Sequence, residues 1–261
     1  MAKIKNDKYY TSLELAKYCV EKTKEIIGED NIAEYVEPSA GSGAFLNYLD
    51  KPYLAYDIEP EDDRIVKVNW LEVDLHYKKG RCVIGNPPFG RANSLLKRFY
   101  KKSTEVADYI SFIMPISQYQ NNQELYQFDL VHSEDLSIQQ YSNIDKHCCL
   151  NIYKKPSKKK QKPTTKLKDV EFIGWRKAKD KDVECDFYIC CYGASIGKIV
   201  DKDSDLVNIN GVIVHNRDLY NKIFEVFKET DWTKVYNMTS TPNLLRWQIV
   251  KYLKEQIPEL E

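Results

Sequence analysis

The sequence predicts an α/β protein whose main domain is a mostly parallel sheet with helices on both faces, followed by a smaller α+β region. Short apolar runs alternate with helical or turn-rich stretches over the first part of the chain, and this alternation favours a parallel sheet. Polar motifs rich in glycine or proline directly follow several of these runs. Because such sheets bind ligands beyond the carboxyl ends of their strands, these motifs are the candidate site.

Composition and charge narrow the class of protein. Of the 261 residues, 43% are apolar and 30% are charged, which suffices for a real core and gives no sign of disorder. The formal net charge is zero, so any nucleic-acid surface would need local clustering of Lys and Arg. The amino terminus lacks an apolar signal region, and no run approaches the ~18 apolar residues of a membrane span. We therefore expect a cytoplasmic protein with no membrane partner.

The cysteine pattern favours reduced thiols over disulfides or zinc. The chain has seven cysteines, an odd number, and two adjacent pairs lie in apolar runs at Cys148–Cys149 and Cys190–Cys191. Neither a CxxC motif nor a zinc-finger spacing occurs. We interpret the cysteines as small buried hydrophobic residues and expect no metal.

The elements of the first domain follow in order from capping and apolar patterns. The capping-box pattern Thr11-Ser12-Leu13-Glu14 predicts a first helix, with apolar residues at helical spacing up to Ile27. Six apolar runs then predict strands, at Ile32–Val36, Tyr53–Asp57, Ile65–Val68, Cys82–Gly85, Tyr109–Met114 and Cys148–Tyr153. Helices are predicted after the first and the fourth strand, at Ala44–Leu49 and Asn93–Val106.

A lysine-rich stretch, Lys154–Lys168, marks the predicted domain boundary. It holds eight lysines, two prolines and no acidic residue, which is typical of an exposed linker. We therefore divide the chain into a first domain over residues 1–155, a linker over 156–168 and a second region over 169–261. In that region we expect strands at Phe187–Tyr192, Ile196–Val200 and Val212–His215, and helices near Leu219–Lys228 and Pro242–Lys254.

The run Val36–Phe45, VEPSAGSGAF, would join the first strand to its helix through a glycine turn. Because glycine has no Cβ, the backbone at Gly41 and Gly43 could approach a ligand closely. Amides at the start of the next helix could then hold a carboxylate, such as that of an amino-acid moiety. A tight turn without a ligand explains the G-x-G pattern equally well when it is taken alone.

Two further strand ends carry residues suited to a nucleoside ligand. Asp57 ends the second strand, where a carboxylate can accept hydrogen bonds from both ribose hydroxyls, and Glu59 competes for this role. Asn69 could accept from an adenine amine, and Trp70 offers a stacking face. A polar loop residue and a core tryptophan would also explain this pair. Ligand-type residues at three successive strand ends favour a nucleoside cofactor.

The fourth strand runs directly into Asn86-Pro87-Pro88-Phe89. The two prolines fix φ and remove two donors, so the Asn86 side-chain oxygen and the Pro87 carbonyl can both face outward as acceptors. Two acceptors suit one NH₂ group, such as the exocyclic amine of adenine. Hydrogen bonds to both N–H groups favour a pyramidal nitrogen that can attack a sulfonium methyl in line. Phe89 offers a π face to the developing positive charge. A rigid turn is the alternative interpretation.

Together, Glu37–Phe45 and Asn86–Phe89 resemble the gamma-class N6-adenine-specific DNA methyltransferases. The resemblance implies a Rossmann-like sheet that binds S-adenosylmethionine and methylates the adenine amine in double-stranded DNA. The catalytic residues that it implies are Asn86, Pro87, Pro88 and Phe89. The cofactor-binding residues that it implies are Thr11, Glu37, Pro38, Ala40, Gly41, Gly43, Phe45, Asp57, Asn69 and Trp70.

The chain departs from the family pattern at two positions. Ser12 follows Tyr10 and Thr11 where proline is usual in the amino-terminal element of the family. Asn69 stands where the family usually has aspartate, which would weaken the contact with the adenine of the cofactor. The resemblance covers the first domain and fades after about residue 155.

The resemblance also implies that the target base is flipped out of the duplex and stacked between Phe89 and a second group. Our candidate for that group is Tyr141, for which a surface tyrosine is an equally good interpretation. Lys158, Lys159 and Lys160 would contact phosphates without reading sequence, and the region 169–261 would recognise the target. The enzyme could act alone or as the modification half of a restriction system, with a restriction endonuclease or a specificity subunit as partner.

Other substrates for the same chemistry are less favoured but stay open. RNA adenine is the hardest alternative to exclude. The DNA cytosine amine is disfavoured because serine often replaces the asparagine in those enzymes, and a protein glutamine amide because such enzymes have no evident need of a lysine-rich linker. From another class, the chain could be an inactive DNA-binding subunit that keeps the fold, although the intact Asn86–Phe89 motif argues against that.

Overall fold

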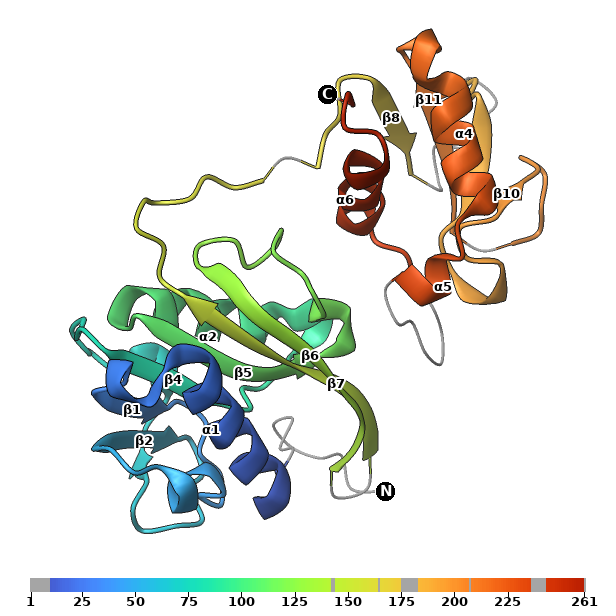
Figure 1. Ribbon diagram of the computed structural model, residues 1–261. Coiled ribbons are helices and arrows are strands. Elements are labelled where there is room, and N and C mark those ends of the chain that lie inside the picture. Colours follow the sequence, from blue (N-terminus) through green and yellow to red (C-terminus); the bar gives the residue numbers. More distant parts are fainter. Residues whose placement is uncertain are drawn as a thin grey trace. The chain divides into compact units, whose positions relative to one another are not determined.

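The computed structural model describes residues 10–141, 144–163, 165–174, 183–206, 208–235 and 243–260. The chain divides into two compact units, Met1–Lys162 and Pro163–Glu261, so the division falls inside the lysine-rich stretch (Figure 1). Each unit has its own sheet and its own hydrophobic core.

The first unit is built on a seven-stranded sheet in the order β3-β2-β1-β4-β5-β7-β6. All neighbours are parallel except β7, which is antiparallel to both β5 and β6. This arrangement confirms the prediction of a mostly parallel, Rossmann-like sheet. Its strands are β1 (Glu34–Glu37), β2 (Tyr53–Asp57), β3 (Val66–Lys67), β4 (Arg81–Gly85), β5 (Tyr109–Pro115), β6 (Asp129–Tyr141) and β7 (Ile144–Lys154).

The order of the strands reverses between β1 and β4. The chain runs outward from β1 to β3 on one side and then returns to place β4 and β5 on the other side. Val36 of β1 pairs with Val83 of β4, so the loops that follow these two strands leave the sheet side by side. In open α/β sheets the crevice at such a reversal is where ligands bind.

One helix covers each face of this sheet, as predicted. Helix α1 (Leu13–Ile27) packs on a face that includes Tyr35 and Ile84, and helix α2 (Ser94–Val106) packs on the face that includes Val36 and Val83 (Figure 1). Alternate residues of the central strands therefore enter different cores, which explains why β1 and β4 are buried at every position rather than on one face only.

Two local predictions in the first unit are wrong. Helix α1 begins one residue later than the capping box suggested, because Ser12 rather than Thr11 caps it and its hydroxyl accepts from the Leu15 amide at 3.2 Å. The segment Ala44–Leu49 forms only a 3₁₀ turn, Phe45–Tyr48, instead of an α-helix. Proline at position 52 disfavours helical backbone just before it, and β2 begins at the next residue. The glycine loop is therefore not followed by the amino terminus of an α-helix, as the predicted carboxylate site would require.

Strand β6 was not predicted, although it is the longest strand of the sheet. It is an edge strand, and polar residues fill most of its sequence, DLVHSEDLSIQQY. Its pairing with β7 shifts register twice, between Leu130 and His132 and between Asp135 and Ile138. Polar side chains and bulges are typical of edges that avoid pairing with other chains, and they hide the strand from apolar patterns.

The second unit is a four-stranded antiparallel sheet with helices, which confirms the predicted smaller α+β region. The strand order is β10-β9-β11-β8, and the core centres on aromatic side chains such as Phe187, Phe227 and Trp232. Strand β8 was not predicted. The elements are β8 (Val170–Ile173), β9 (Phe187–Cys190), β10 (Ile199–Val200), β11 (Ile209–Val214), α4 (Tyr220–Glu229), α5 (Trp232–Val235) and α6 (Arg246–Gln256).

All seven cysteines are free, and six of them are buried. Within the described ranges, no helix is long and apolar enough to cross a membrane. The same residues contain no cluster of His, Cys, Asp and Glu side chains that could hold a metal ion.

A buried ion pair joins the central strands β1 and β4 at their amino ends. Arg81, only 4% exposed, places Nε 2.7 Å from Oε2 of Glu34 and donates from Nη1 to the carbonyls of His76 and Val106. The more exposed Lys78 contacts the other oxygen of Glu34 at 2.7 Å. Burial opposes ionisation of Glu34, but the hydrogen bonds from Lys78 and Arg81 outweigh it and lower the pKa of this carboxyl.

We expect Arg81→Met to destabilise the first unit by about 3–5 kcal/mol, because it leaves the Glu34 carboxylate buried without its main partner. Lys78→Met is the matched control and should cost at most about 1 kcal/mol, since that side chain is half exposed. Urea unfolding monitored by far-UV circular dichroism measures both. Equal losses in the two variants would show that the buried contact contributes no more than the surface one.

Candidate active site

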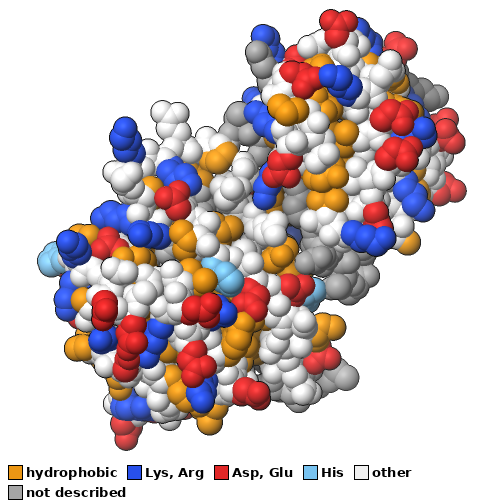
Figure 2. Space-filling model, in the orientation of Figure 1, with side chains coloured by type: hydrophobic (Ala, Val, Ile, Leu, Met, Phe, Trp, Pro, Cys, Tyr) orange, Lys and Arg blue, Asp and Glu red, His pale blue; other side chains and the backbone are white. Residues whose placement is uncertain are grey.

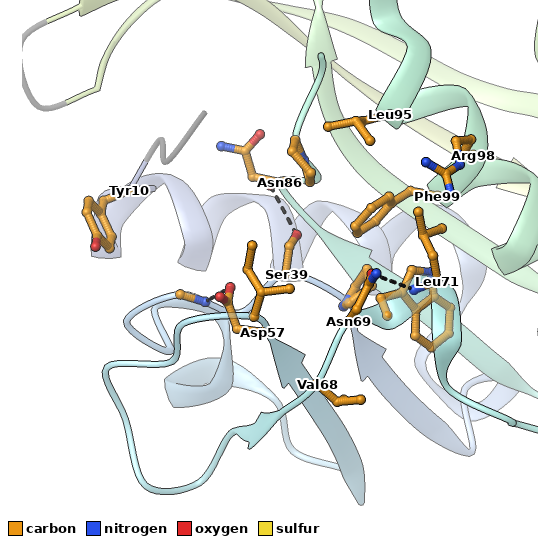
Figure 3. A pocket seen from close by; sticks show the side chains of 15 residues that line it. Tyr10, Ser39, Asp57, Val68, Asn69, Leu71, Asn86, Leu95, Arg98 and Phe99 are labelled. Atoms are coloured by element: carbon orange, nitrogen blue, oxygen red, sulfur yellow. Dashed lines mark hydrogen bonds between the residues drawn. The ribbon is translucent and has the colours of Figure 1, made fainter. Parts of the chain in front are cut away.

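A cavity of about 270 Å³ opens at the carboxyl ends of the parallel strands, at the reversal between β1 and β4 (Figure 3). Its walls come from the loops after β1, β2, β3 and β4, from helix α2 and from the segment before α1. The lining residues are Tyr10, Pro38, Ser39, Gly41, Asp57, Ile58, Val68, Asn69, Trp70, Leu71, Asn86, Pro88, Leu95, Arg98 and Phe99. Side chains far apart in sequence are thus brought to one place.

The predicted site residues fall into two groups. Those that line the cavity are Pro38, Gly41, Asp57, Asn69, Trp70, Asn86 and Pro88. Those that lie outside its walls are Thr11, Glu37, Ala40, Gly43, Phe45, Pro87 and Phe89. Most of the second group are buried directly behind the walls. They shape the loops that carry the first group.

Asp57 holds the glycine loop in place. Its Oδ2 accepts from the Gly41 amide at 2.9 Å, and its Oδ1 accepts from the Glu59 amide at 2.8 Å. Gly41 has a φ of 53°, in the left-handed region that glycine tolerates best. Each carboxylate oxygen has a second lone pair, so Asp57 can still accept from a ligand. Glu59 does not line the cavity, so the geometry favours Asp57 for the ribose contact.

Asn69 and Trp70 are partly committed to the protein itself. The Asn69 side chain accepts from the Leu71 amide at 3.1 Å and donates to Glu72 at 2.8 Å, so it caps the 3₁₀ turn Trp70–Glu72. Trp70 is 1% exposed, stacks on Tyr56 and belongs to the core. The interpretation of Trp70 as a core tryptophan is therefore the one that the packing supports.

Apolar walls around the second and third strand ends were not predicted. Ile58, 47% exposed, lines the cavity together with Val68 and Leu71. These side chains could cover the faces of a planar ring in the part of the cavity that Asn69 borders. An apolar residue directly after the acid that ends β2 is the signal that could have identified Ile58.

Glu37 is a buried acid behind the wall formed by Pro38 and Ser39. Burial, with the negative Asp57 nearby, raises its pKa to about 8. Its Oε2 has no hydrogen-bond partner among the residues that the structure describes. The side chain lies close to Gly85, which has a φ of 151°; a Cβ there would lie 3.2 Å from Cγ of Glu37, a tight contact. A poorly compensated acid at this place favours a cationic ligand.

The side-chain amide of Asn86 is oriented from several directions. Its Nδ2 donates to the Thr11 hydroxyl at 3.2 Å and the amide also interacts with the Tyr141 hydroxyl. The Ser39 hydroxyl donates to the Asn86 backbone carbonyl at 3.3 Å (Figure 3). Because the amide nitrogen is directed toward protein hydroxyls, the side-chain oxygen is the atom left to accept from a ligand, although it is buried in this structure.

Tyr141 lies behind Asn86 and not opposite Phe89 across a cavity. It is 2% exposed, lines neither neighbouring cavity, and donates to the Cys148 sulfur at 3.6 Å. A surface tyrosine, our alternative interpretation, is therefore wrong. The Tyr141 hydroxyl therefore contacts the Asn86 side-chain amide, and its ring faces neither cavity.

Phe89 faces a second cavity, of about 400 Å³, on the other side of the tetrapeptide. Its ring is 9% exposed and packs mainly into the core beneath α1. This second cavity is lined by Phe89, Gly90, Arg91, Asn93, Pro115, Lys146 and His147. Asn86 and Pro88 line the first cavity and Phe89 lines the second, so the tetrapeptide has a cavity on each side.

The lysine-rich stretch begins near the amino ends of the parallel strands, opposite to the end where the cavities lie. Lys154, its first residue, pairs with Tyr109 at the start of β5, whereas the cavities lie at the ends of the parallel strands. Lys160 contacts Asp129 at 2.6 Å, while Lys158 and Lys159 are exposed. The chain therefore leaves the sheet on the side opposite to the tetrapeptide.

No family model matches the chain, and a comparison with curated proteins finds no match. Similar solved structures include a Pyrococcus horikoshii protein assigned as an RNA methyltransferase, with 14% identity, 59% of this chain and 90% of that chain covered, and a TM-score of 0.46. The 23S rRNA methyltransferase ErmE has 10% identity, 60% and 74% coverage, and a TM-score of 0.41. The Synechocystis magnesium protoporphyrin IX methyltransferase with bound SAM has 10% identity, 54% and 79% coverage, and a TM-score of 0.37.

Proposed function

We propose that this protein transfers a methyl group from S-adenosylmethionine to the exocyclic amine of adenine in double-stranded DNA. The observation that carries the proposal is the shared cavity: Asn86 and Pro88 line it together with Gly41 and Asp57. A nucleoside-type binding loop and an amine-binding tetrapeptide thus open into one space. That is the arrangement that methyl transfer between two bound molecules needs.

The residues around the cavity fit S-adenosylmethionine by chemistry. Asp57 would accept from the ribose hydroxyls, and Ile58 and Leu71 would cover the adenine ring. Glu37 would lie near the cationic amino-acid end, where its carboxylate would gain a partner. The amides of the Gly41 loop, rather than a helix terminus, would hold the carboxylate of the cofactor. When bound, the cofactor supplies an electrophilic methyl on a sulfonium.

Asn86 and Pro87 would position the substrate amine. The Asn86 side-chain oxygen and the Pro87 carbonyl would each accept one N–H, which directs the nitrogen lone pair toward the cofactor side of the cavity. Thr11 and Ser39 keep Asn86 in place, so its side-chain oxygen would be ordered before the substrate arrives. Preorganised dipoles of this kind stabilise the positive charge that develops on the nitrogen. No general base is needed before transfer.

The choice of adenine in DNA rests on the resemblance of Asn86–Phe89 to the gamma-class enzymes. Acidic and basic side chains are interspersed on both units in the face shown in Figure 2, which favours recognition by specific contacts over a broad basic surface. The second unit would supply these contacts, alone or with a restriction or specificity partner. RNA adenine remains the second candidate substrate.

The test is methyl transfer from labelled S-adenosylmethionine to matched duplex DNA and RNA, followed by modified-nucleoside analysis. We expect N6-methyladenine in DNA and a loss of ~10²–10³ in rate for Asn86→Ala, since one preorganised acceptor is removed. Cofactor affinity, measured by calorimetry, should be nearly unchanged. Asn122→Ala, at an exposed asparagine of the same unit, is the control and should keep full activity.

Methylation of RNA alone would replace DNA as the substrate while leaving the chemistry intact. Product on cytosine or on a protein amide would contradict the adenine assignment. Turnover of Asn86→Ala close to that of the control would refute the proposed role of this residue.

The buried acid predicts a pH dependence of cofactor binding. With its pKa raised to about 8, Glu37 is protonated in the free protein below that pH, and a cationic ligand beside it must displace the proton. Affinity for S-adenosylmethionine should therefore rise as pH increases from 6 to about 8 and then level off. Calorimetry in buffers of different ionisation enthalpy measures both the affinity and the released proton.

Glu37→Gln is the matched control, because glutamine keeps the shape of the protonated acid. It should fold normally, bind the cofactor more weakly above pH 8 and release no proton from this site. Any titration of the cofactor itself is common to both proteins and cancels in the comparison. The same proton release in both proteins would show that Glu37 does not face the cationic end.

A further inference from the structure

We propose that Tyr141 is a positioning residue: its buried hydroxyl holds the Asn86 side-chain amide so that the amide oxygen is directed to the substrate amine. The proposal rests on the proposed function, because that function assigns the Asn86 oxygen the task of accepting from the amine. It gives Tyr141 a role other than stacking on the target base. It also adds a residue to the reaction that does not itself touch the substrate.

The hairpin of β6 and β7 brings Tyr141 next to the tetrapeptide. Cys148 of β7 pairs with Pro115, the last residue of β5, so residues 144–147 of β7 run beyond the end of that strand. The hairpin bends there (Figure 1), and Tyr141, the last residue of β6, enters the core beneath α1. Because Tyr141 is only 2% exposed, its hydroxyl is surrounded by protein groups rather than by bulk water.

The hydrogen bonds of the Tyr141 hydroxyl have a defined direction. Its proton is donated to the Cys148 sulfur, at 3.6 Å between oxygen and sulfur, so the phenol oxygen can act only as an acceptor toward other groups. Burial raises the pKa of Tyr141, and the Asn86 amide acts in the opposite direction, as a donor to the phenol oxygen does. The Asn86 amide therefore donates and the Tyr141 oxygen accepts.

Two hydroxyl groups of the protein thus select one of the two orientations of the Asn86 amide. The side-chain nitrogen carries two hydrogens, and it donates to the Thr11 hydroxyl at 3.2 Å and to the Tyr141 hydroxyl. If the planar amide turned by half a rotation, it would present NH₂ instead of oxygen to the substrate amine. Two N–H donors cannot bond to each other, so the selected orientation is the one that methyl transfer needs.

Tyr141 restrains the amide more strongly than Thr11 does. Thr11 is half-buried and lies in the segment before α1, outside the sheet and the helices, whereas Tyr141 is buried and belongs to a strand. A hydrogen bond that is shielded from water is electrostatically stronger than one that water can replace. Without the Tyr141 hydroxyl, the orientation of the amide would depend on the half-buried contact with Thr11, and the amide could turn.

The test compares Tyr141→Phe with Tyr35→Phe in the full chain. Both variants remove one hydroxyl from a buried tyrosine of the same core, but within the described ranges the Tyr35 hydroxyl has no hydrogen-bond partner. We expect Tyr141→Phe to lower kcat for methyl transfer about three- to tenfold, the range that one hydrogen bond typically supplies. The dissociation constant of S-adenosylmethionine should stay unchanged, and Tyr35→Phe should change neither value.

Nuclear magnetic resonance of the Asn86 side chain gives a readout that needs no turnover. The NH₂ signals of this residue are the pair that disappears from the proton–nitrogen correlation spectrum of Asn86→Ala. Tyr141→Phe should shift this pair, because it removes the acceptor of one N–H, whereas Tyr35→Phe should leave the pair in place. A pair that stays in place in Tyr141→Phe would overturn the proposal, as would a normal kcat in that variant or an equal fall of kcat in Tyr35→Phe.

Melting curves decide whether Tyr141→Phe is a fair probe. If it melts well below Tyr35→Phe, Cys148→Ala becomes the decisive variant. That variant keeps the phenol but removes the acceptor that directs the Tyr141 proton away from Asn86. It should therefore shift the same pair of signals, and a pair that stays in place would overturn the proposal.

The outcomes separate this proposal from the proposed function. If the Asn86 signals shift as expected but the wild type methylates neither DNA nor RNA, the orientation of the amide by Tyr141 stands and the methyl transfer fails. If the wild type methylates adenine while Tyr141→Phe keeps both its kcat and its Asn86 signals, only the positioning role fails.

Discussion

The parallel pairing of β1 with β4 is the constraint on which the rest of the first unit depends. It sets the loop after Glu37 beside the loop after Gly85, and both loops line the cavity. Gly85 relieves the close approach of the two, since a Cβ there would lie 3.2 Å from Cγ of the buried Glu37 side chain. The ion pair of Arg81 with Glu34 fixes the same two strands at their other end. One strand pair therefore links stability and site geometry.

Much of the fold could be predicted because the parallel strands contain apolar runs and are followed by polar or glycine-rich loops. Strand β2 was predicted at its observed bounds, and α2 to within one residue. Elements without an apolar pattern were missed, as in the polar edge strand β6. An α-helix was predicted at Ala44–Leu49, but this segment forms a 3₁₀ turn. Its apolar spacing suits a helix, yet Pro52 and the start of β2 leave no room for further helical turns.

The same distinction between residues with a local sequence pattern and residues without one applies to the candidate site. Residues within continuous motifs, such as Gly41 and Asn86, could be found from the sequence because each motif has its own chemistry. Residues that reach the site from elsewhere could not be found in this way: Arg98 lines the first cavity from α2, and Lys146 lines the second from β7. Tyr141 was singled out, yet its burial gives it a place behind the asparagine that no local pattern indicates. Long-range placement is a property of the topology.

The segment before α1 limits how far the amino terminus can be shortened without changing the cavity. Tyr10 packs over Gly41 and donates a hydrogen bond to Glu61, and Thr11 accepts one from Asn86, so two adjacent residues contact the loops after β1, β2 and β4. Neither residue belongs to the sheet or to a helix. A deletion or protease cut that extends to Thr11 would therefore remove contacts with the cavity walls without removing any strand or helix.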